Sequence, residues 1–495
     1  MSHRVSHGSA PPVDLRLVPA ALTAWAVTAA GILLDVGPLL AGCCLGGGAA
    51  FWVAARRRPA LRAVAVGVVG TAAVGAGFAF AAGLRSDAVH DHPAGARFGA
   101  TEWVTVMPTD SPRPLSGGRV MLHANLTHLG DRDSGGRVVV FATGPDFATL
   151  SPGEPARFRA RLTRPRRRDL SVATLSATGR PTVGEASAIA RAAESVRARF
   201  TAAAREVLPD DQSAMLPGLV LGDTTAVAPP TTADFRAAGL THLTAVSGAN
   251  VTIVCGAVLL GAGLIGPRIA VILAAAALAG FVTVVQPGAS VLRAALMGSI
   301  ALIGVLSSRR RQAVPALSAS VIALMVLAPH LAVDAGFALS VSATAALVLI
   351  APRWSAALTA RGWPKPVADA AAVALAAHLV TAPLLAAISG RLSLVSVFAN
   401  LLVAPVIPPI TVLGTGAAAL CSVWPAAGGA LIRFTGPELW WLLTVARCAA
   451  RLPGAVIAVP AGWAGLLAVG GGFLAAVGLW HRGHRAAQRR AVGGP

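Results

Sequence analysis

The stretch Gly239–Val251, GLTHLTAVSGANV, sets polar side chains into a long apolar run. Its polar members include His242, Ser247 and Asn250. Polar groups at membrane depth cost free energy, and they persist mainly where they line an aqueous path or bond to another helix. The stretch therefore predicts a helical membrane protein with a hydrated path through its helices.

The composition of the whole chain favours the same class. The 495 residues are 55% hydrophobic and 13% charged, with a mean hydropathy of +0.68, which is too apolar for an ordinary soluble protein. The net charge is +20, and Lys365 is the only lysine, so nearly every cation is an arginine. Arginines can serve membrane topology, anionic lipid or nucleic acid, so the charge alone does not choose among these partners.

The first part of the chain reads as membrane helices that lead to an external segment. Residues 1–14 predict a disordered N-terminus. Residues 15–84 predict three transmembrane helices, since a span needs about 20 apolar residues. The cluster Arg56–Arg58 separates the second and third spans, and the positive-inside rule places it in the cytoplasm with the N-terminus. The third span then exits, so residues 85–185 are predicted to lie outside.

This external insert has the pattern of a small β domain. Its short segments are separated by Gly, Pro, Asp and Asn turns, which is typical of antiparallel strands. Five strands in this length favour a small barrel of OB-like fold, with a sandwich fragment as the alternative. Residues 186–209 follow as an amphipathic helix that is expected to lie on the outer surface. The predicted strands are Glu102–Met107, Arg119–Leu126, Arg137–Thr143, Ala156–Leu162 and Ser171–Ala177.

Residues 210–480 predict nine further spans, and residues 481–495 predict a basic cytoplasmic tail. The segment 394–420 departs from a straight span because Pro405, Pro408 and Pro409 break a helix. Broken helices at membrane depth are buried in protein or line water. The predicted fold class is a polytopic α-helical membrane protein of about 12 transmembrane helices with one small extracytoplasmic OB-like insert. It is expected in the cytoplasmic membrane, with both termini in the cytoplasm.

The insert carries seven arginines within twelve residues. Arg157, Arg159 and Arg161 alternate along a predicted strand, which puts them on one face. Such a field suits the backbone of a polyanion; anionic lipid headgroups or plain solvation are the alternatives. Few aromatic residues are present for base stacking, and Phe158 is expected beside the arginine face. The candidate DNA-binding residues are Arg157, Arg159, Arg161, Arg164, Arg166, Arg167 and Arg168.

A second set of candidates would line the path between the helices. Arg293 is the most telling, because a guanidinium keeps its charge and Val291–Ile300 is otherwise apolar apart from Ser299. Its alternative role is to snorkel to the outer interface. For the hydroxyl and amide side chains the alternative is hydrogen bonding between packed helices. The candidate channel-lining residues are Asp223, Arg236, His242, Ser247, Asn250 and Arg293.

Several of these elements resemble the membrane core of the ComEC family of competence proteins. Leu221–Asp223 matches the family's Leu-Gly-Asp element, Gly239–Leu243 its Gly-Leu-x-His-Leu element, and Ser247–Gly248 its Ser-Gly element. Asn250 stands where the family often has histidine, so any role that needs a titrating imidazole at this position is in doubt. Further similar segments are Gly288–Met297, Asp334–Ala346 and His378–Pro405. The resemblance implies a channel that imports single-stranded DNA across the inner membrane during natural transformation, with an OB-like insert at this position.

The resemblance also implies partners: single-stranded DNA, membrane lipids, an external DNA receptor, a cytoplasmic ATP-driven motor and a separate nuclease. The only lysine is followed by Pro366, so the chain lacks a phosphate-cradling GxxxxGK[ST] loop. Many relatives carry a metallo-β-lactamase-like motif, whereas His90-Asp91-His92 here lacks the downstream Asp-His pair. We therefore expect no enzyme activity, no metal and no cofactor.

Two other functions compete with this interpretation. A transporter of a small solute or lipid precursor would also use broken helices and buried polar residues. An intramembrane serine hydrolase would need Ser247 as nucleophile, with His242 or His378 as base. On a helix, His242 and Ser247 would point in different directions, which disfavours the hydrolase.

Overall fold

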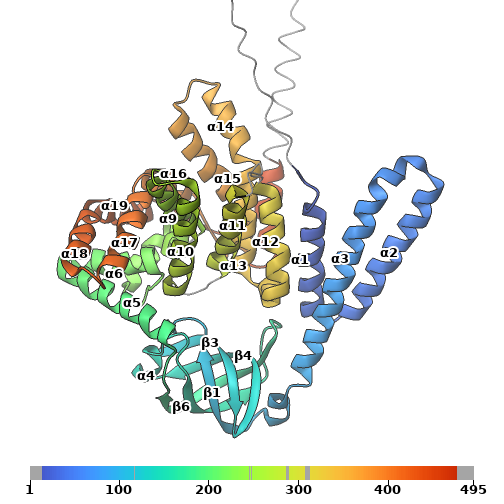
Figure 1. Ribbon diagram of the computed structural model, residues 1–495, viewed down its shortest axis with the longest axis horizontal. Helices are drawn as coiled ribbons and strands as arrows, with labels where there is room; N and C mark the ends of the chain where they lie inside the picture. The colour runs from blue at the N-terminus through green and yellow to red at the C-terminus, as the bar shows by residue number, and fades with distance from the viewer. Residues whose placement is uncertain are drawn as a thin grey trace, which may run out of the picture. The chain divides into compact units, whose positions relative to one another are not determined.

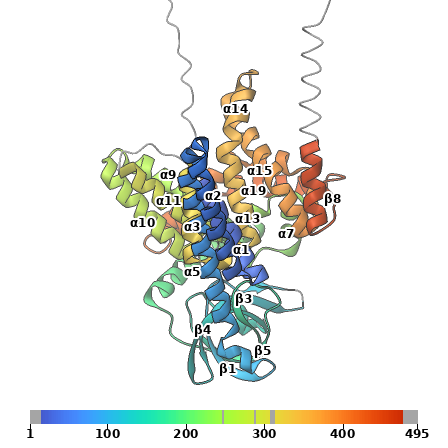
Figure 2. The same ribbon diagram turned by 90° about the vertical axis from the view of Figure 1, so that its right-hand side faces the viewer.

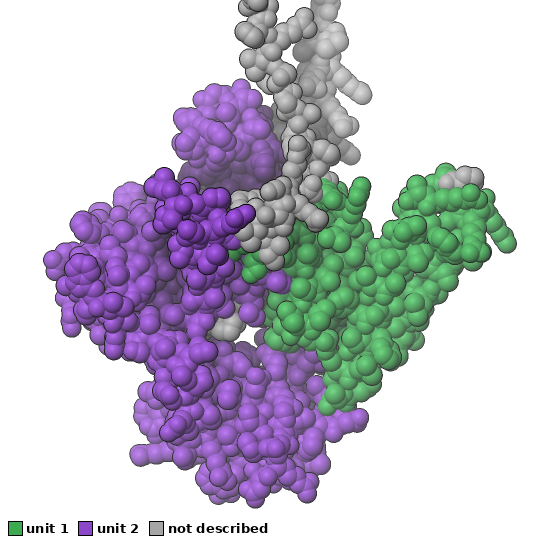
Figure 3. Space-filling view, in the orientation of Figure 1, with its two compact units in different colours: residues 1–88, 299–333 green, residues 89–298, 334–495 purple. Residues whose placement is uncertain are grey.

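The computed structural model describes residues 14–115, 117–244, 246, 248–285, 289–306 and 313–475, and most of them are helical (Figure 1). The expected basic tail, Ser247 and residues 1–13 of the expected disordered N-terminus lie outside the described residues. The chain divides into two compact units, coloured in Figure 3. The first contains Met1–Ala88 and Ser299–Val333, and the second contains Val89–Gly298 and Asp334–Pro495.

The first unit is a small group of packed helices. Its elements are α1 (Val18–Leu34), α2 (Gly37–Arg57), α3 (Pro59–His90), α12 (Ala313–Leu327) and the 3-10 turn η2 (Pro329–Val333). A Cβ added to Gly37 would lie 2.6 Å from the Gly83 Cα, so the backbones of α2 and α3 are in direct contact. Trp25 Nε1 donates to the Ala332 carbonyl at 2.9 Å, which ties α1 to η2.

The second unit begins with a six-stranded β domain (Figure 2). The strand order β1-β5-β6-β4-β3-β2 is closed by a further pairing of β1 with β3. All its pairings are antiparallel except that of β4 with β6. Leaving out the two-residue β2, this is the Greek-key order of a closed five-stranded OB-fold. The elements are η1 (Pro93–Arg97), β1 (Thr101–Pro108), β2 (Arg113–Pro114), β3 (Arg119–Leu129), β4 (Arg132–Thr143), α4 (Pro145–Ala148), β5 (Ala156–Thr163) and β6 (Ser171–Val183).

Alternation along the strands builds the barrel core. Every second residue of β5 is buried, from Ala156 to Leu162, because successive side chains of a strand point to opposite faces. Phe158 is fully buried and meets Phe147 of α4 edge-on, with ring centroids 5.2 Å apart. Full burial of a Phe contributes about 1.5–3 kcal/mol to folding. The strands therefore present an apolar face inward and a polar face outward.

Helix α5 (Ala188–Val207) follows the barrel and packs on the helical part of this unit. Its buried face includes Phe200 and also Arg197, which is only 8% exposed. Arg197 Nη1 donates to the Val284 carbonyl at 2.9 Å, and its Nη2 pairs with Glu194 at 2.6 Å. The structure buries Arg197 because the ion pair and a helix-end carbonyl satisfy its guanidinium.

The other described elements of the second unit are helices, apart from a two-stranded pairing of β7 with β8. Its elements are α6 (Asp210–Leu221), α7 (Pro229–Ala237), α8 (Thr241–Thr244), α9 (Gly248–Ala262), α10 (Pro267–Val285), the start of α11 (Ala289–Leu306), α13 (Ala335–Leu349), α14 (Ala351–Thr359), α15 (Lys365–Ser389), β7 (Arg391–Ser393), α16 (Ser396–Val403), α17 (Ile407–Leu420), α18 (Pro425–Phe434), α19 (Gly436–Arg451) and β8 (Val456–Ala458).

Within the described residues, five helices are long and apolar enough to cross a membrane, or six if the bent pair α16 and α17 counts as one span. The pair bends by 55°, where the prolines of segment 394–420 predict a break. The remaining apolar helices have 10–17 residues, which is short of the roughly 20 that span the hydrocarbon. The described residues thus contain several apolar helices of spanning length, and the count of about twelve spans stays a prediction.

Candidate nucleic-acid interface

The arginine row of the barrel lies on the outer face of β5. Arg157, Arg159 and Arg161 are all exposed, and they alternate with the buried core residues. Side chains two positions apart on a strand are about 6.8 Å apart. Among the described residues, no carboxylate lies within ion-pair distance of these three guanidinium groups. The row therefore carries three exposed positive charges at alternate positions of one strand.

The loop from β5 to β6 continues this row. It holds Arg164 and Arg166–Arg168, and all four side chains are exposed. In an OB-fold this loop, between the fourth and fifth strands of the barrel, is one of those that contact oligonucleotides. The structure thus brings the seven predicted arginines onto one strand and the loop that directly follows it. We call these seven residues the arginine surface.

The aromatic residue on the arginine surface is not the expected one. Phe158 was predicted beside this face, but it lies in the barrel core, because it shares the inward register of Ala156 and Ala160. Trp103 of β1 pairs with Arg159 instead and is 46% exposed. The Arg157 Cζ lies 5.4 Å from the centre of the Trp103 ring. The alternation that identified the arginine face already carried this information about Phe158.

The helical candidates are only partly gathered together. Arg236 and His242 have exposed side chains on α7 and α8. Asp223 follows α6 and accepts hydrogen bonds from the backbone N–H and the hydroxyl of Thr225, at 3.0 and 2.6 Å. Gly222 just before it has a φ of +80°, a left-handed conformation that favours glycine. Asp223 therefore caps a turn, and among the described residues no hydrogen bond or ion pair joins its carboxylate to the other candidates.

Asn250 and Arg293 lie deeper among the helices. Asn250 is buried, and its Nδ2 donates to the Leu219 carbonyl at 3.0 Å, which joins α9 to α6. The Arg293 side chain of α11 is only 4% exposed. A Cβ added to Gly248, at the start of α9, would lie 3.2 Å from Arg293 Nη2. The structure thus brings Arg293 to the amino end of the helix that carries Asn250.

Within the described part of the chain, Arg293 bonds to neutral acceptors. Its Nη1 donates to the Ser340 carbonyl at 3.0 Å and to the Thr344 hydroxyl of α13. Its Nε has no hydrogen-bond partner, and no ion pair with a described carboxylate neutralises it. The structure therefore does not show snorkelling, in which the guanidinium would extend out of the protein. A buried cation without a counter-ion costs several kcal/mol, and such a residue is a candidate for function.

Sequence reasoning did not select Ser340 and Thr344, which hold Arg293. They stand four residues apart on α13, so they share one helix face. The signal was present as a pair of hydroxyl residues in an apolar helix. Each side chain alone, however, resembles ordinary hydrogen bonding between helices. Only the position of Arg293 distinguishes this pair from the other small polar residues of the chain.

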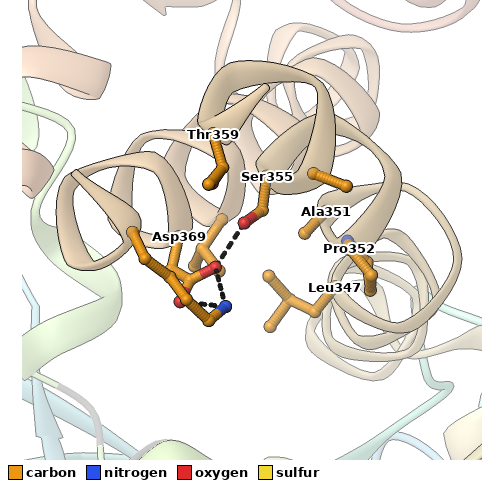
Figure 4. Close-up of a pocket in the computed structure, with 9 residues that line it drawn as sticks. Leu347, Ala351, Pro352, Ser355, Thr359 and Asp369 are labelled. Atoms are coloured by element: carbon orange, nitrogen blue, oxygen red, sulfur yellow. Dashed lines mark hydrogen bonds and ion pairs between the residues drawn. The ribbon is translucent and has the colours of Figure 1, made fainter. Parts of the chain in front are cut away.

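A separate pocket of about 590 Å³ lies between α14 and α15 (Figure 4). The Ser355 hydroxyl donates to Asp369, and the Lys365 Nζ contacts the same carboxylate at 3.1 Å. These polar groups satisfy one another, as the dashed lines of Figure 4 show. Over the described parts of the chain, no three His, Cys, Asp or Glu side chains gather in a metal-binding arrangement.

Comparison with known proteins identifies the family. Residues 219–483 match the competence protein family. This is more than half of the chain, so the protein belongs to that family, in agreement with the ComEC-like motifs. The chain is 28% identical over 214 residues to ComE operon protein 3 of Bacillus subtilis (strain 168). That match covers 43% of this chain and 27% of the relative, so the chain spans about a quarter of its length. No solved structure matches.

Proposed function

We propose that this protein is a multi-pass channel of the cytoplasmic membrane that imports single-stranded DNA during natural transformation. The strand first meets the arginine surface and then enters a path flanked by the segments Asp223–Asn250 and Val291–Met297. Twelve spans with both termini in the cytoplasm belong to this proposal. So do an external DNA receptor, a cytoplasmic ATP-driven motor, a separate nuclease and the absence of enzyme activity in this chain.

The observation that carries the proposal is the arginine surface. Three exposed arginines without a carboxylate partner among the described residues stand at alternate positions of β5, about 6.8 Å apart along the backbone, a spacing comparable to that of phosphates along an extended nucleic-acid strand. Each phosphate that an arginine neutralises releases a counter-ion. The family match begins at residue 219, after the barrel, so the barrel's role rests on this geometry.

Arg293 supports the second half of the route. Its charge is buried against neutral acceptors, and a polyanion that reached it would supply the missing counter-charge. The bent pair of α16 and α17 adds a broken helix, which at membrane depth is buried in protein or lines water.

The test compares two matched pairs of arginines. Arg166 and Arg167 are both changed to Gln on the arginine surface; Arg119 and Arg132, also exposed on the barrel, are changed to Gln as the control. Purified protein in nanodiscs is titrated with labelled single-stranded DNA at several salt concentrations, and DNA uptake is measured in cells. The first pair is expected to flatten the plot of log affinity against log salt by about 0.7 per lost phosphate contact and to lower uptake.

The control pair removes the same charge and is expected to leave the slope nearly unchanged. Equal effects of the two pairs would mean that only net charge matters. Unchanged uptake in the Arg166 and Arg167 variant, with normal expression, would remove the arginine surface from the mechanism.

The α14–α15 pocket favours a second candidate function, that of a transporter of a small solute or lipid precursor. Its lining is largely apolar around the Ser355, Lys365 and Asp369 group. Flux of labelled DNA into proteoliposomes tests the two functions against each other, because a small-solute transporter would not pass the strand. For the serine hydrolase, Ser247 lies outside the described residues, and the His242 side chain is exposed on α8.

A further inference from the structure

One aromatic side chain of the barrel lies exposed among the arginines. Trp103 is on β1, next to β5 in the barrel, and it faces Arg159 directly in the antiparallel register. Thr101 and Thr105, its neighbours on the same face of β1, stand opposite Arg161 and Arg157. Because threonine is short, the indole rises above this part of the sheet. The arginine surface thus has a flat apolar ring at its centre.

The ring is held in place on one side. The Arg157 Cζ lies 5.4 Å from the centre of the Trp103 ring, within the range of a cation–π contact. Nearly half of the side chain is still exposed. Cross-strand neighbours on one face of an antiparallel pair lie within reach of aromatic side chains, so Arg159 is beside the ring as well. A planar group that covered the exposed part of the indole would have cations on either side.

We propose that Trp103 stacks an unpaired base of a DNA strand whose phosphates lie along Arg159 and Arg161. This inference rests on the proposed function and adds that the surface distinguishes single-stranded from double-stranded DNA. Phosphates attract the arginines whether the DNA is single or double. In a duplex, however, neighbouring bases cover both faces of each base, so none is available to the indole. Trp103 therefore makes the arginine surface selective for single strands.

The chemistry of the surface favours this ligand over a lipid bilayer. Aromatic residues that anchor proteins at membrane interfaces sit beside apolar surface that enters the lipid. Around Trp103 the same face carries threonines and arginines, together with Ser176 and Thr178, which pair with Arg161 and Arg159 from β6. Base stacking on an aromatic ring within a positively charged groove is the common mode of single-strand binding.

The experiment uses the full chain in zwitterionic nanodiscs and three labelled probes. These are a short single-stranded oligonucleotide, the same strand with a central run of abasic sites, and a duplex of the same length. The variants are Trp103→Leu and Trp103→Phe, with Trp363→Leu as control, because Trp363 is equally exposed at 45% but lies between α14 and α15. Affinities are measured by fluorescence anisotropy.

Trp103→Leu is expected to weaken binding of the intact single strand by about 5- to 150-fold, the range for one lost stacking contact. Binding of the abasic strand and of the duplex should hardly change. Trp103→Phe should retain most of the affinity for the intact strand, and Trp363→Leu all of it. As a second measurement, the single strand should quench tryptophan fluorescence more in the wild type than in Trp103→Phe.

The possible failures are distinguishable. If the wild type binds no DNA, the proposed function fails. If it binds DNA but Trp103→Leu weakens intact, abasic and duplex probes equally, the stacking inference alone is overturned. If Trp103→Leu leaves all three affinities unchanged but lowers binding to anionic vesicles, Trp103 is a membrane anchor, and the inference is again wrong.

Discussion

Arginine occupies two opposite environments in this chain. On β5, Arg157, Arg159 and Arg161 extend into solvent from a strand whose other face forms the barrel core. On α11, Arg293 is buried among α9, α11 and α13, held by a carbonyl and a hydroxyl. The exposed charges cost little to keep and add mainly long-range attraction. The buried charge is expensive, so its retention needs a stronger reason.

The two environments suit two different steps, the attraction of a polyanion to the surface and its passage between the helices. The arginine surface can concentrate a polyanion, but its effect falls with salt. Arg293 lies where salt screens little, so a phosphate that reaches it would feel a stronger field. The two regions should therefore respond differently to mutation, to salt and to the charge of the DNA backbone.

The largest expected effect comes from Arg293→Met. This change keeps an unbranched apolar side chain of similar volume but removes the charge. DNA uptake is expected to fall by about 30-fold or more, the scale for losing a buried charged contact. The melting temperature of the protein in nanodiscs should stay equal or rise, because an apolar side chain of similar volume avoids the desolvation cost. Normal uptake, or uptake lost together with the fold, would contradict this function for Arg293.

Arg197→Met tests a buried arginine that has a counter-ion. It would leave Glu194 without its partner and the Val284 carbonyl without its donor. We expect a loss of about 1–3 kcal/mol in stability and faster proteolysis near α5. Arg199→Met is the matched control, since Arg199 is exposed and bonds to the Ser422 carbonyl. The comparison breaks down if Arg197→Met is as well tolerated as Arg293→Met.

Arg159→Gln should act on binding alone. Its side chain is exposed, so stability should stay within about 0.5 kcal/mol of the wild type. The salt dependence of single-strand binding should flatten by about 0.7 in log–log slope. A titration at two or more salt concentrations measures the affinity and its dependence on salt. A loss of affinity that does not depend on salt would assign Arg159 a different role.

The smallest expected effect comes from Gly248→Ala. The new Cβ would lie 3.2 Å from both Arg293 Nη2 and the Ala294 Cβ, so the guanidinium must shift by a few tenths of an ångström. We expect uptake to fall only a few-fold. In the Arg293→Met background the same change should have a smaller effect, since the guanidinium is gone and only the Ala294 Cβ remains close. Additive effects in this double-mutant cycle would place Gly248 outside the site.

The sequence predicted the barrel well because its signals are local. Alternation with a period of two locates strands, and turn residues mark their ends. The strands predicted in this way correspond to β3, β4 and β5. The same alternation placed the three arginines outward. The error with Phe158 came from judging proximity along the chain, where it adjoins Arg157, rather than by the face it shares with Ala160.

The helical part was less predictable from the sequence. Hydropathy gives the apolar runs but not where a helix ends, and Gly222 and Gly239 divide the region after α5 into short helices. The partners of Arg293 on α13 are 47 and 51 residues away in sequence, a separation that no local pattern reports. Asn250 could be identified as a buried polar group, but not that its amide would bond to the Leu219 carbonyl.

The shared acceptor beneath Arg293 bears on how that side chain can behave. The Thr344 hydroxyl donates to the Ser340 carbonyl at 2.9 Å, independently of the arginine. If the guanidinium turned away, this oxygen would keep a donor, so no orphaned acceptor would pull it back. The Arg293 guanidinium therefore bonds to α13, but its departure would leave the Ser340 carbonyl hydrogen-bonded to Thr344.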